Sequence, residues 1–86
     1  MDVSFTPTFI RMLKALPQDL QEEAIEKIEQ FKNPRSHLTL KVHKLKGRLK
    51  GRFSFSINYR TRVVFTYLKP RQAVLLAIGD HDVYNI

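Results

Sequence analysis

The sequence predicts a single α+β domain in which two helices pack on one face of a mostly antiparallel sheet. Two observations on spacing predict this class: apolar residues recur every three to four positions up to about residue 31, and they alternate with polar ones from about residue 52 onward. Prolines, glycines and asparagines separate the segments. The length suits one domain with a modest core, so residues 1–86 are treated as one unit.

The first third of the chain predicts a short strand followed by two helices. "DVSF" suits the strand, and Thr6 followed by Pro7 is typical of a helix start with Thr6 as the N-cap. Pro17 opens a second helix, "PQDLQEEAIEKIEQF", which carries one apolar stripe and ends before a predicted loop at "NPRSH". The helices are therefore expected to form an antiparallel hairpin on a short link.

The rest of the chain predicts a C-terminal meander of three or more strands. In "RFSFSIN", Phe53, Phe55 and Ile57 share one face of a half-buried strand, and "YRTRVVFTYL" follows as its hairpin partner after a turn near Asn58. Pro70 suits the second position of the next turn. "AVLLAI" is apolar on both faces, which is typical of a central strand. This meander completes the predicted sheet.

Basic residues dominate the middle of the chain. The net charge is +7 and the isoelectric point is near 10.1, and no Asp or Glu lies between Gln30 and Gly79. Such a block predicts a surface for nucleic acid or another phosphate ligand. An anionic membrane or an acidic protein would fit the same charge. The twelve cations of this block are Lys32, Arg35, Lys41, Lys44, Lys46, Arg48, Lys50, Arg52, Arg60, Arg62, Lys69 and Arg71.

The composition excludes several kinds of chemistry. Because there is no cysteine, disulfides, thiolate zinc sites and thiol nucleophiles are excluded, and a reducing cytosol is permitted. The three histidines, His37, His43 and His81, have no recognised metal-binding spacing. No signal peptide and no apolar run of roughly 20 residues is present. We expect a cytoplasmic protein that uses no metal or cofactor.

The stretch "KVHKLKGRLKGR" is the first candidate binding site. Its cations are spaced to neutralise an RNA backbone, and Gly47 and Gly51 allow the main chain to turn sharply or approach the ligand closely. The alternative is a solvated, mobile loop. The spacing does not match a P-loop, because three residues separate the glycines and Arg follows each one. The candidate phosphate-binding residues here are Lys44, Lys46, Arg48, Lys50 and Arg52.

Two further groups of residues are candidates for chemistry. Arg60 and Arg62 are two positions apart and are expected to share one strand face, with Arg52 beside them if the hairpin register allows. In "GDHDVYNI", His81 follows the apolar strand and can transfer a proton near neutral pH, while Tyr84 lies three residues further on. The alternative is a histidine in a surface turn and a tyrosine packed on the sheet edge. Together these groups suit metal-free RNA cleavage by 2′-hydroxyl attack.

The stretch "LKGRLKGRFSFSINYRTRVVF", followed by "AVLLAIGDHDVY", resembles the RelE/ParE superfamily of bacterial type II toxin–antitoxin toxins. The likeness covers nearly the whole chain and implies a RelE-like fold. It also implies that Arg62 contacts the scissile phosphate, that His81 acts on the leaving oxygen, and that Tyr84 stacks on or orients the nucleotide. No Glu stands in this region to serve as the general base, so a lysine or His81 would have to do so.

The resemblance implies partners as well as chemistry. The superfamily includes ribosome-dependent mRNA endonucleases, or mRNA interferases, whose partners are mRNA, the ribosome and a small antitoxin that covers the basic face. It also includes ParE-type inhibitors of DNA gyrase. We therefore expect an mRNA interferase that inhibits translation. The alternatives are a gyrase inhibitor and an inactive basic RNA-binding relative.

Overall fold

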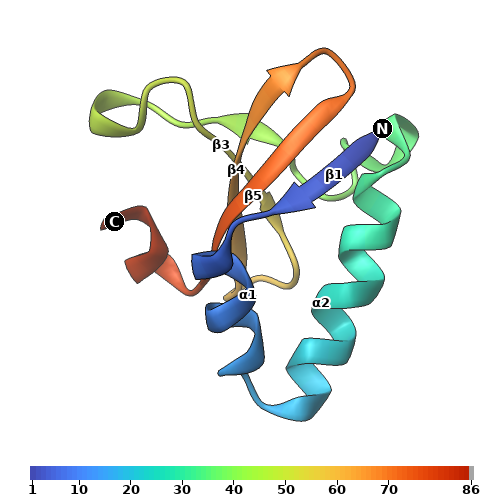
Figure 1. Cartoon of the computed structure of the whole chain (residues 1–86), viewed down its shortest axis with the longest axis vertical. Helices are drawn as coiled ribbons and strands as arrows, with labels where there is room; N and C mark the ends of the chain where they lie inside the picture. Colours follow the sequence, from blue (N-terminus) through green and yellow to red (C-terminus); the bar gives the residue numbers. More distant parts are fainter. Residues whose placement is uncertain (86) are drawn as a thin grey trace.

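The computed structural model describes residues 1–85 and confirms the predicted α+β class (Figure 1). Within these residues, two α-helices and five strands are joined by loops that contain two 3₁₀ turns, and a third 3₁₀ turn follows the last strand. In chain order the elements are β1 (Asp2–Phe5), α1 (Pro7–Lys14), α2 (Gln18–Phe31), η1 (Pro34–Ser36), β2 (His43–Lys44), η2 (Gly47–Leu49), β3 (Phe53–Ser56), β4 (Arg62–Lys69), β5 (Gln72–Gly79) and η3 (His81–Asn85).

The five strands form one mixed sheet in the order β1-β5-β4-β3-β2. Strand β1 pairs with β5 in parallel, with Val3 opposite Ala73, whereas every other pair is antiparallel. The mostly antiparallel sheet and its C-terminal meander are thus as predicted. The two-residue strand β2, which the sequence did not predict, adds an edge beside β3 and ties the basic segment to the sheet.

The helix starts are built as the sequence predicts. Thr6 Oγ1 accepts a hydrogen bond from the Phe9 amide at 3.0 Å, and Pro7 occupies the first helical position. The Thr6 hydroxyl also donates to the Leu76 carbonyl at 3.3 Å, which fastens the start of α1 to β5. Helix α2 begins directly after Pro17 and runs opposite to α1, so the predicted helical hairpin is confirmed (Figure 1).

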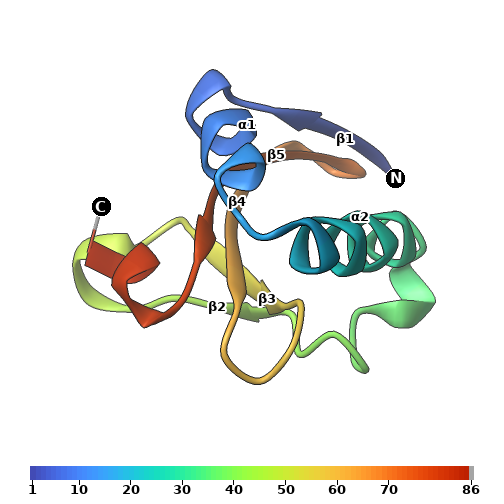
Figure 2. The ribbon, with the colours of Figure 1, turned by 90° about the horizontal axis from the view of Figure 1, so that it is seen from below.

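The main core lies between α2 and one face of the sheet (Figure 2). Phe31 of α2 stacks on Phe55 with ring centroids 4.3 Å apart and meets Phe65 edge-on at 4.7 Å. All three rings are fully buried, and each contributes roughly 1.5–3 kcal/mol of hydrophobic stabilisation. Tyr67 closes this core beside Phe53, and burial raises the pKa of its hydroxyl.

The opposite face of the sheet is covered as well, by η3 and by the segment that connects β2 to β3 (Figure 2). Val64 and Ala77 form a second, smaller cluster with Val83 of η3. Ser54 is fully buried there, so the expectation of a half-exposed β3 with a polar, solvated face is wrong for this residue. The reason is the C-terminal turn, which folds back over the sheet instead of leaving it.

The two hairpin turns follow their predicted chemistry. In the first, Asn58 Oδ1 accepts hydrogen bonds from the amides of Arg60 at 2.9 Å and Thr61 at 2.8 Å. In the second, Pro70 takes the second position and Arg71 has a φ of 69°, the backbone of a type II turn. Both turns therefore lie where the sequence places them.

Candidate functional site

Residues 45–52, which we call the basic loop, form a closed and hydrogen-bonded tip. The Leu45 amide donates to the Arg52 carbonyl at 2.9 Å, and the Arg52 amide donates to the Leu49 carbonyl at 2.9 Å. Gly47 and Gly51 have φ values of 69° and 86°, a region that glycine enters without steric cost. The expectation that these glycines turn the main chain sharply is met at both positions.

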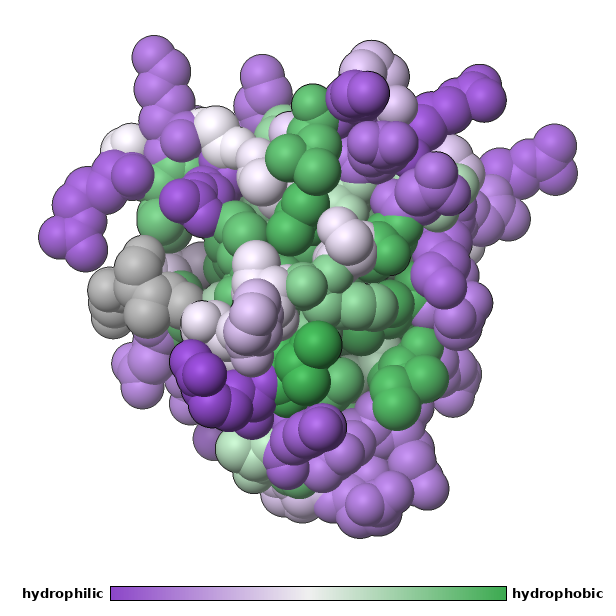
Figure 3. Space-filling model, in the orientation of Figure 1, coloured by the Kyte–Doolittle hydropathy of each residue, from purple (hydrophilic) through white to green (hydrophobic). Residues whose placement is uncertain are grey.

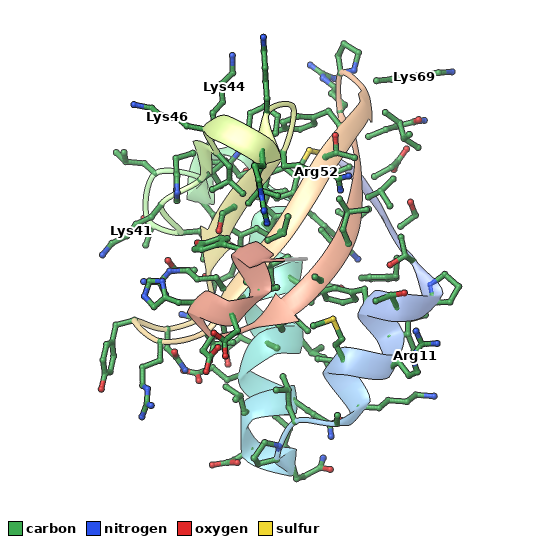
Figure 4. All side chains as sticks on the ribbon, turned by 90° about the vertical axis from the view of Figure 1, so that its left-hand side faces the viewer. Arg11, Lys41, Lys44, Lys46, Arg52 and Lys69 are labelled. Carbon is green, nitrogen blue, oxygen red and sulfur yellow. The ribbon has the colours of Figure 1, made fainter. Side chains whose placement is uncertain are left out.

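The basic loop places its leucines against the sheet and its cations in solvent. Leu45 packs on the cluster of Val64, Ala77 and Val83, and the Thr66 hydroxyl donates to the Gly51 carbonyl at 3.0 Å. Lys44, Lys46, Arg48 and Lys50 are all exposed. Figure 4 shows Lys44 and Lys46 projecting outward, whereas Arg52 lies over the sheet.

These cations have no anionic partner within the described part of the chain. Among residues 1–85 the one ion pair joins Lys32 to Glu29, outside the loop. The positive charges therefore repel one another, and a polyanion that neutralises them would bind favourably. The phosphate-binding track stays a prediction, and the hydrogen-bonded loop differs from the mobile, solvated loop of the alternative.

A hollow of about 270 Å³ separates the basic loop from η3 and the start of α1. Its floor is apolar, with Val64, Ala77 and Val83, and the Arg52 side chain lies at its margin. Arg52 thus faces the same side of the sheet as Val64. The other residues that line the hollow are Thr6, Thr8, Leu49 and Leu76.

Arg62 begins β4 and is held by the turn that precedes it. One terminal nitrogen of its guanidinium donates to the Asn58 carbonyl and, at 3.3 Å, to the Thr61 carbonyl. The side chain is half-buried. Because a guanidinium has five N–H donors, the anchored nitrogen leaves the other donors free for a ligand. The turn therefore fixes the direction in which Arg62 can bind an anion.

The prediction that Arg60 and Arg62 share one strand face is wrong. Arg60 lies in the turn between β3 and β4, because the Asn58 side chain binds its amide and delays the start of β4 to Arg62. Arg60 is exposed and lines a hollow with His81. The two arginines therefore serve different surfaces.

The turn η3 carries the two remaining candidate residues and packs on the sheet through Val83 and Tyr84. Val83 is 3% exposed and packs on Val64 and Ala77 of the sheet. The Tyr84 hydroxyl and Ser54 Oγ form a hydrogen bond of 2.9 Å. The exposed His81 ring meets the Tyr84 ring edge-on, with centroids 6.0 Å apart. The structure thus brings His81 and Tyr84 together, and it adds Ser54, which the sequence analysis missed because an alternating serine looks solvent-facing.

The flanking acids take different roles around His81. Asp80 Oδ1 accepts the Asp82 amide at 3.0 Å and caps η3. Within the described residues neither carboxylate binds the His81 ring. A hollow of about 330 Å³ opens beside this turn, lined by Tyr59, Arg60, Asp80, His81 and Asp82. Tyr59 was also missed by the sequence analysis, although an aromatic residue in a polar turn was a usable signal.

Residues 1–85 contain neither a cluster of side chains that could hold a metal ion nor a membrane-spanning helix. No three histidine or acidic side chains among residues 1–85 come together in a way that could hold a metal ion. The rings of His37 and His43 instead bind the main-chain carbonyls of Phe31 and Lys41, both at 2.8 Å. Within the same residues, neither helix has the length and apolar character needed to cross a membrane.

The face seen in Figure 1 carries an apolar surface. Figure 3 shows hydrophobic side chains gathered over the middle of this face and long hydrophilic side chains projecting from its margins. Exposed apolar residues of the molecule include Phe5 at 43%, Ile10 at 40% and Leu68 at 66% exposure. Such a surface beside many cations is suited to a protein partner with both apolar and acidic residues.

Sequence comparison and structure comparison give different results for this chain. No protein-family model matches the sequence, and no curated protein matches it significantly. Solved structures do match. The RelBE2 toxin–antitoxin complex from Mycobacterium tuberculosis aligns with a TM-score of 0.74 and 23% identity over 93% of this chain and 96% of the other.

Two further solved structures give the same result. A YoeB–YefM complex from Staphylococcus aureus aligns with a TM-score of 0.72 and 20% identity, over 94% of this chain and 97% of the other. An archaeal RelE–RelB complex from Pyrococcus horikoshii aligns with a TM-score of 0.70 and 18% identity, over 92% of each chain. The predicted RelE-like fold is therefore confirmed.

Proposed function

We propose that this chain, which has a RelE-like fold, is the toxin of a type II toxin–antitoxin system and cleaves mRNA on the ribosome. One observation carries the proposal. Turn η3 places Tyr84 on the sheet face on which Ser54 lies and the exposed His81 ring against Tyr84, beside a basic loop without acidic partners among the described residues. The face thus combines groups for proton transfer with groups for phosphate binding.

The reaction needs no group beyond side chains and the RNA itself. The 2′-hydroxyl of the RNA loses its proton to a base and attacks the adjacent phosphorus, while the bond to the 5′ oxygen breaks. A proton supplied to that oxygen completes a cyclic 2′,3′-phosphate and a free 5′-hydroxyl. Negative charge grows on the phosphoryl oxygens along the way, so fixed cationic donors lower the barrier.

Arg62 is our candidate for stabilising that charge. Its guanidinium is oriented by the Asn58 and Thr61 carbonyls before any ligand arrives, so little rearrangement is needed on binding. His81 is the candidate for proton transfer because it is exposed at the end of β5, with its ring supported by Tyr84. Tyr84 would position the nucleotide through its ring, since its hydroxyl is bound to Ser54. The general base is His81 or a lysine of the basic segment.

Flanking phosphates would bind along Lys44, Lys46, Arg48, Lys50 and Arg52, with Arg60 on the far side of His81. The same cations, together with the apolar surface of Figure 3, suit an antitoxin segment that is acidic and apolar and folds on binding. RNA and antitoxin would then compete for one face. Such an arrangement explains how a partner keeps the enzyme inactive in the cytoplasm.

A second candidate function is favoured by the internal contacts of Arg62 and Tyr84. Both side chains satisfy polar groups of the fold, which is what residues of a purely structural role would do. A gyrase inhibitor acting through a protein surface, or an inactive RNA-binding relative, would retain these contacts. For a gyrase inhibitor, His81→Ala should leave growth inhibition unchanged, whereas overexpression of an inactive relative should not inhibit growth at all.

Single-turnover cleavage of an mRNA positioned on 70S ribosomes tests the proposal. We expect Arg62→Ala and His81→Ala to lose roughly 10²-fold or more in rate, as expected for losing a charge-stabilising or proton-transfer group. Arg71→Ala is the matched control for a lost arginine, because this exposed side chain lies in the β4–β5 turn, at the opposite end of β5 from η3, and it should change the rate less than about threefold.

Failure of the wild-type protein to cut ribosome-bound mRNA would overturn the nuclease assignment. A gyrase supercoiling assay would then decide between the remaining candidates. Detection of cyclic phosphate ends on the product would support the 2′-hydroxyl route, and 5′-phosphate ends would contradict it.

A further inference from the structure

The hollow between the β3–β4 turn and η3 differs in chemistry from the rest of the candidate site. Tyr59 forms one side and is 80% exposed, the most exposed aromatic side chain among the described residues. Exposure of an aromatic ring to water is unfavourable, so the Tyr59 ring is suited to stacking on another planar ring such as a nucleobase. The volume of about 330 Å³ is large enough for one nucleobase.

The charges around this hollow argue against a phosphate as its occupant. Two carboxylates, Asp80 and Asp82, line it beside a single arginine, Arg60, so unlike the basic loop it has no excess of positive charge. Asp80 already uses one carboxylate oxygen to cap η3. Asp82 has an exposed carboxylate whose oxygens make no hydrogen bond within the described chain. A carboxylate accepts hydrogen bonds only, so its preferred partner is a group rich in N–H donors.

The turn that carries Tyr59 is fixed from three directions. The Asn58 side chain accepts the amides of Arg60 and Thr61, and its amide group donates to Glu23 of α2 at 3.1 Å. The Arg62 guanidinium holds two carbonyls of the same turn. The Tyr59 ring is therefore presented on a rigid base, which lowers the entropy lost when a partner stacks on it.

We propose that this hollow is a subsite for one unpaired guanine base, with Tyr59 as the stacking surface and Asp82 as the acceptor. Guanine presents an imino N–H and an amino group side by side, and these two parallel donors match the two oxygens of one carboxylate. Uracil carries a carbonyl on each side of its single N–H, so the same carboxylate repels it. The inference deepens the proposed function, on which its biological meaning rests: the guanine would lie next to the phosphate at His81.

Titration with mononucleotides tests this subsite without a ribosome. Guanosine and uridine 5′-monophosphate carry the same phosphate, so a difference between them reports on the base. We expect amide NMR signals of residues 59–60 and 80–82 to shift on addition of the guanine nucleotide, with about tenfold tighter binding than for the uracil nucleotide.

Two variants separate the stacking contact from the hydrogen bonds. Tyr59→Ala should weaken binding of both nucleotides about tenfold, and Tyr59→Phe should retain most of it. Asp82→Asn should remove the preference for guanine while leaving uridine monophosphate binding within about twofold. Lys69→Ala, at the distant β4–β5 turn, is the control for a lost charge, and circular dichroism verifies that each variant folds.

Equal affinity for the two nucleotides would overturn the proposal. So would shifts confined to the basic loop and reproduced by inorganic phosphate alone, since these would show phosphate binding only. The result is independent of the cleavage assay. Guanine selectivity without cleavage would support the subsite and refute the nuclease assignment. Cleavage without guanine selectivity would support the nuclease assignment and refute the subsite.

Discussion

The basic loop and the corner formed by the Asn58–Arg62 turn and η3 are both rich in polar groups, but they hold them differently. In the loop, hydrogen bonds fix the backbone and Leu45 packs on the sheet, while the cations project freely. In the corner, the functional groups themselves are bound, Arg62 by carbonyls and Tyr84 by Ser54. Under the proposed function, the free cations would attract a polyanion from any direction, whereas the anchored groups would act on a single phosphate of it.

The largest expected difference between the two regions comes from exchanging arginine for lysine. Arg62→Lys keeps the charge but loses the planar guanidinium, in which one nitrogen binds the two carbonyls while the others remain directed at a phosphate, so we expect ribosome-dependent cleavage to fall roughly 10²-fold. Arg48→Lys in the loop keeps a point charge near the phosphates and should change cleavage less than about twofold. Equal losses for both variants would remove the distinction between the regions.

The salt dependence of RNA affinity tests the role proposed for the cations of the basic loop. If five phosphates are engaged, affinity for single-stranded RNA should fall with log salt at a slope of about −3.5, or about 100-fold between 50 and 200 mM. Replacing Lys46, Arg48 and Lys50 by alanine should reduce the slope to about −1.4. Fluorescence anisotropy with a labelled oligonucleotide measures both slopes, and a slope near zero for the wild type would contradict a phosphate track.

The Ser54–Tyr84 hydrogen bond tests whether the corner is anchored as described. Tyr84→Phe leaves the fully buried Ser54 hydroxyl without its partner, and Ser54→Ala does the same to the partly buried Tyr84 hydroxyl, so each should lower the free energy of unfolding by about 1–2 kcal/mol. The double variant should be destabilised by less than the sum of the two. Urea denaturation of the four proteins measures this coupling, and strict additivity would show that the bond contributes nothing.

The smallest expected difference is in stability, between alanine substitutions at one glycine of the basic loop and at one glycine beside the corner. At Gly47 an added Cβ would meet no atom within 4 Å, yet the φ of 69° makes Gly47→Ala unfavourable by about 1 kcal/mol. At Gly79 the Cβ would lie 3.8 Å from the Val83 Cβ, an ordinary contact, so Gly79→Ala should change stability by less than about 0.5 kcal/mol. Thermal unfolding compares them, and similar values would contradict the role assigned to the backbone of the loop.

Most of the fold could be predicted because its local signals are strong. Thr6 and Pro7 mark a helix start, and Asn58 and Pro70 mark turns, through contacts with residues only a few positions away. The parallel pairing of β1 with β5 and the two-residue β2 left no such signal, since both depend on partners that are distant in the sequence or on very few residues.

The candidate site could be predicted only as a set of residues. The spacing of Arg60 and Arg62 predicts one face, but a side-chain hydrogen bond from Asn58 shifts the start of β4 and separates them. Ser54 has the alternation of a surface residue and is buried by a turn that lies 30 residues later. Contacts between remote segments decide both outcomes, and local patterns do not contain them.

The parallel pairing of β1 with β5 sets the order in which a newly made chain can assemble. Residues 2–5 are synthesised well before their sheet partners, residues 72–75. The hydrogen bonds of the Thr6 hydroxyl and amide likewise cannot form until the carbonyls of Leu75 and Leu76 have been synthesised. Contacts between such remote segments slow folding because a long loop must close first. A nascent chain therefore cannot complete the sheet, or the surface on which η3 packs, until residues 72–79 have emerged from the ribosome.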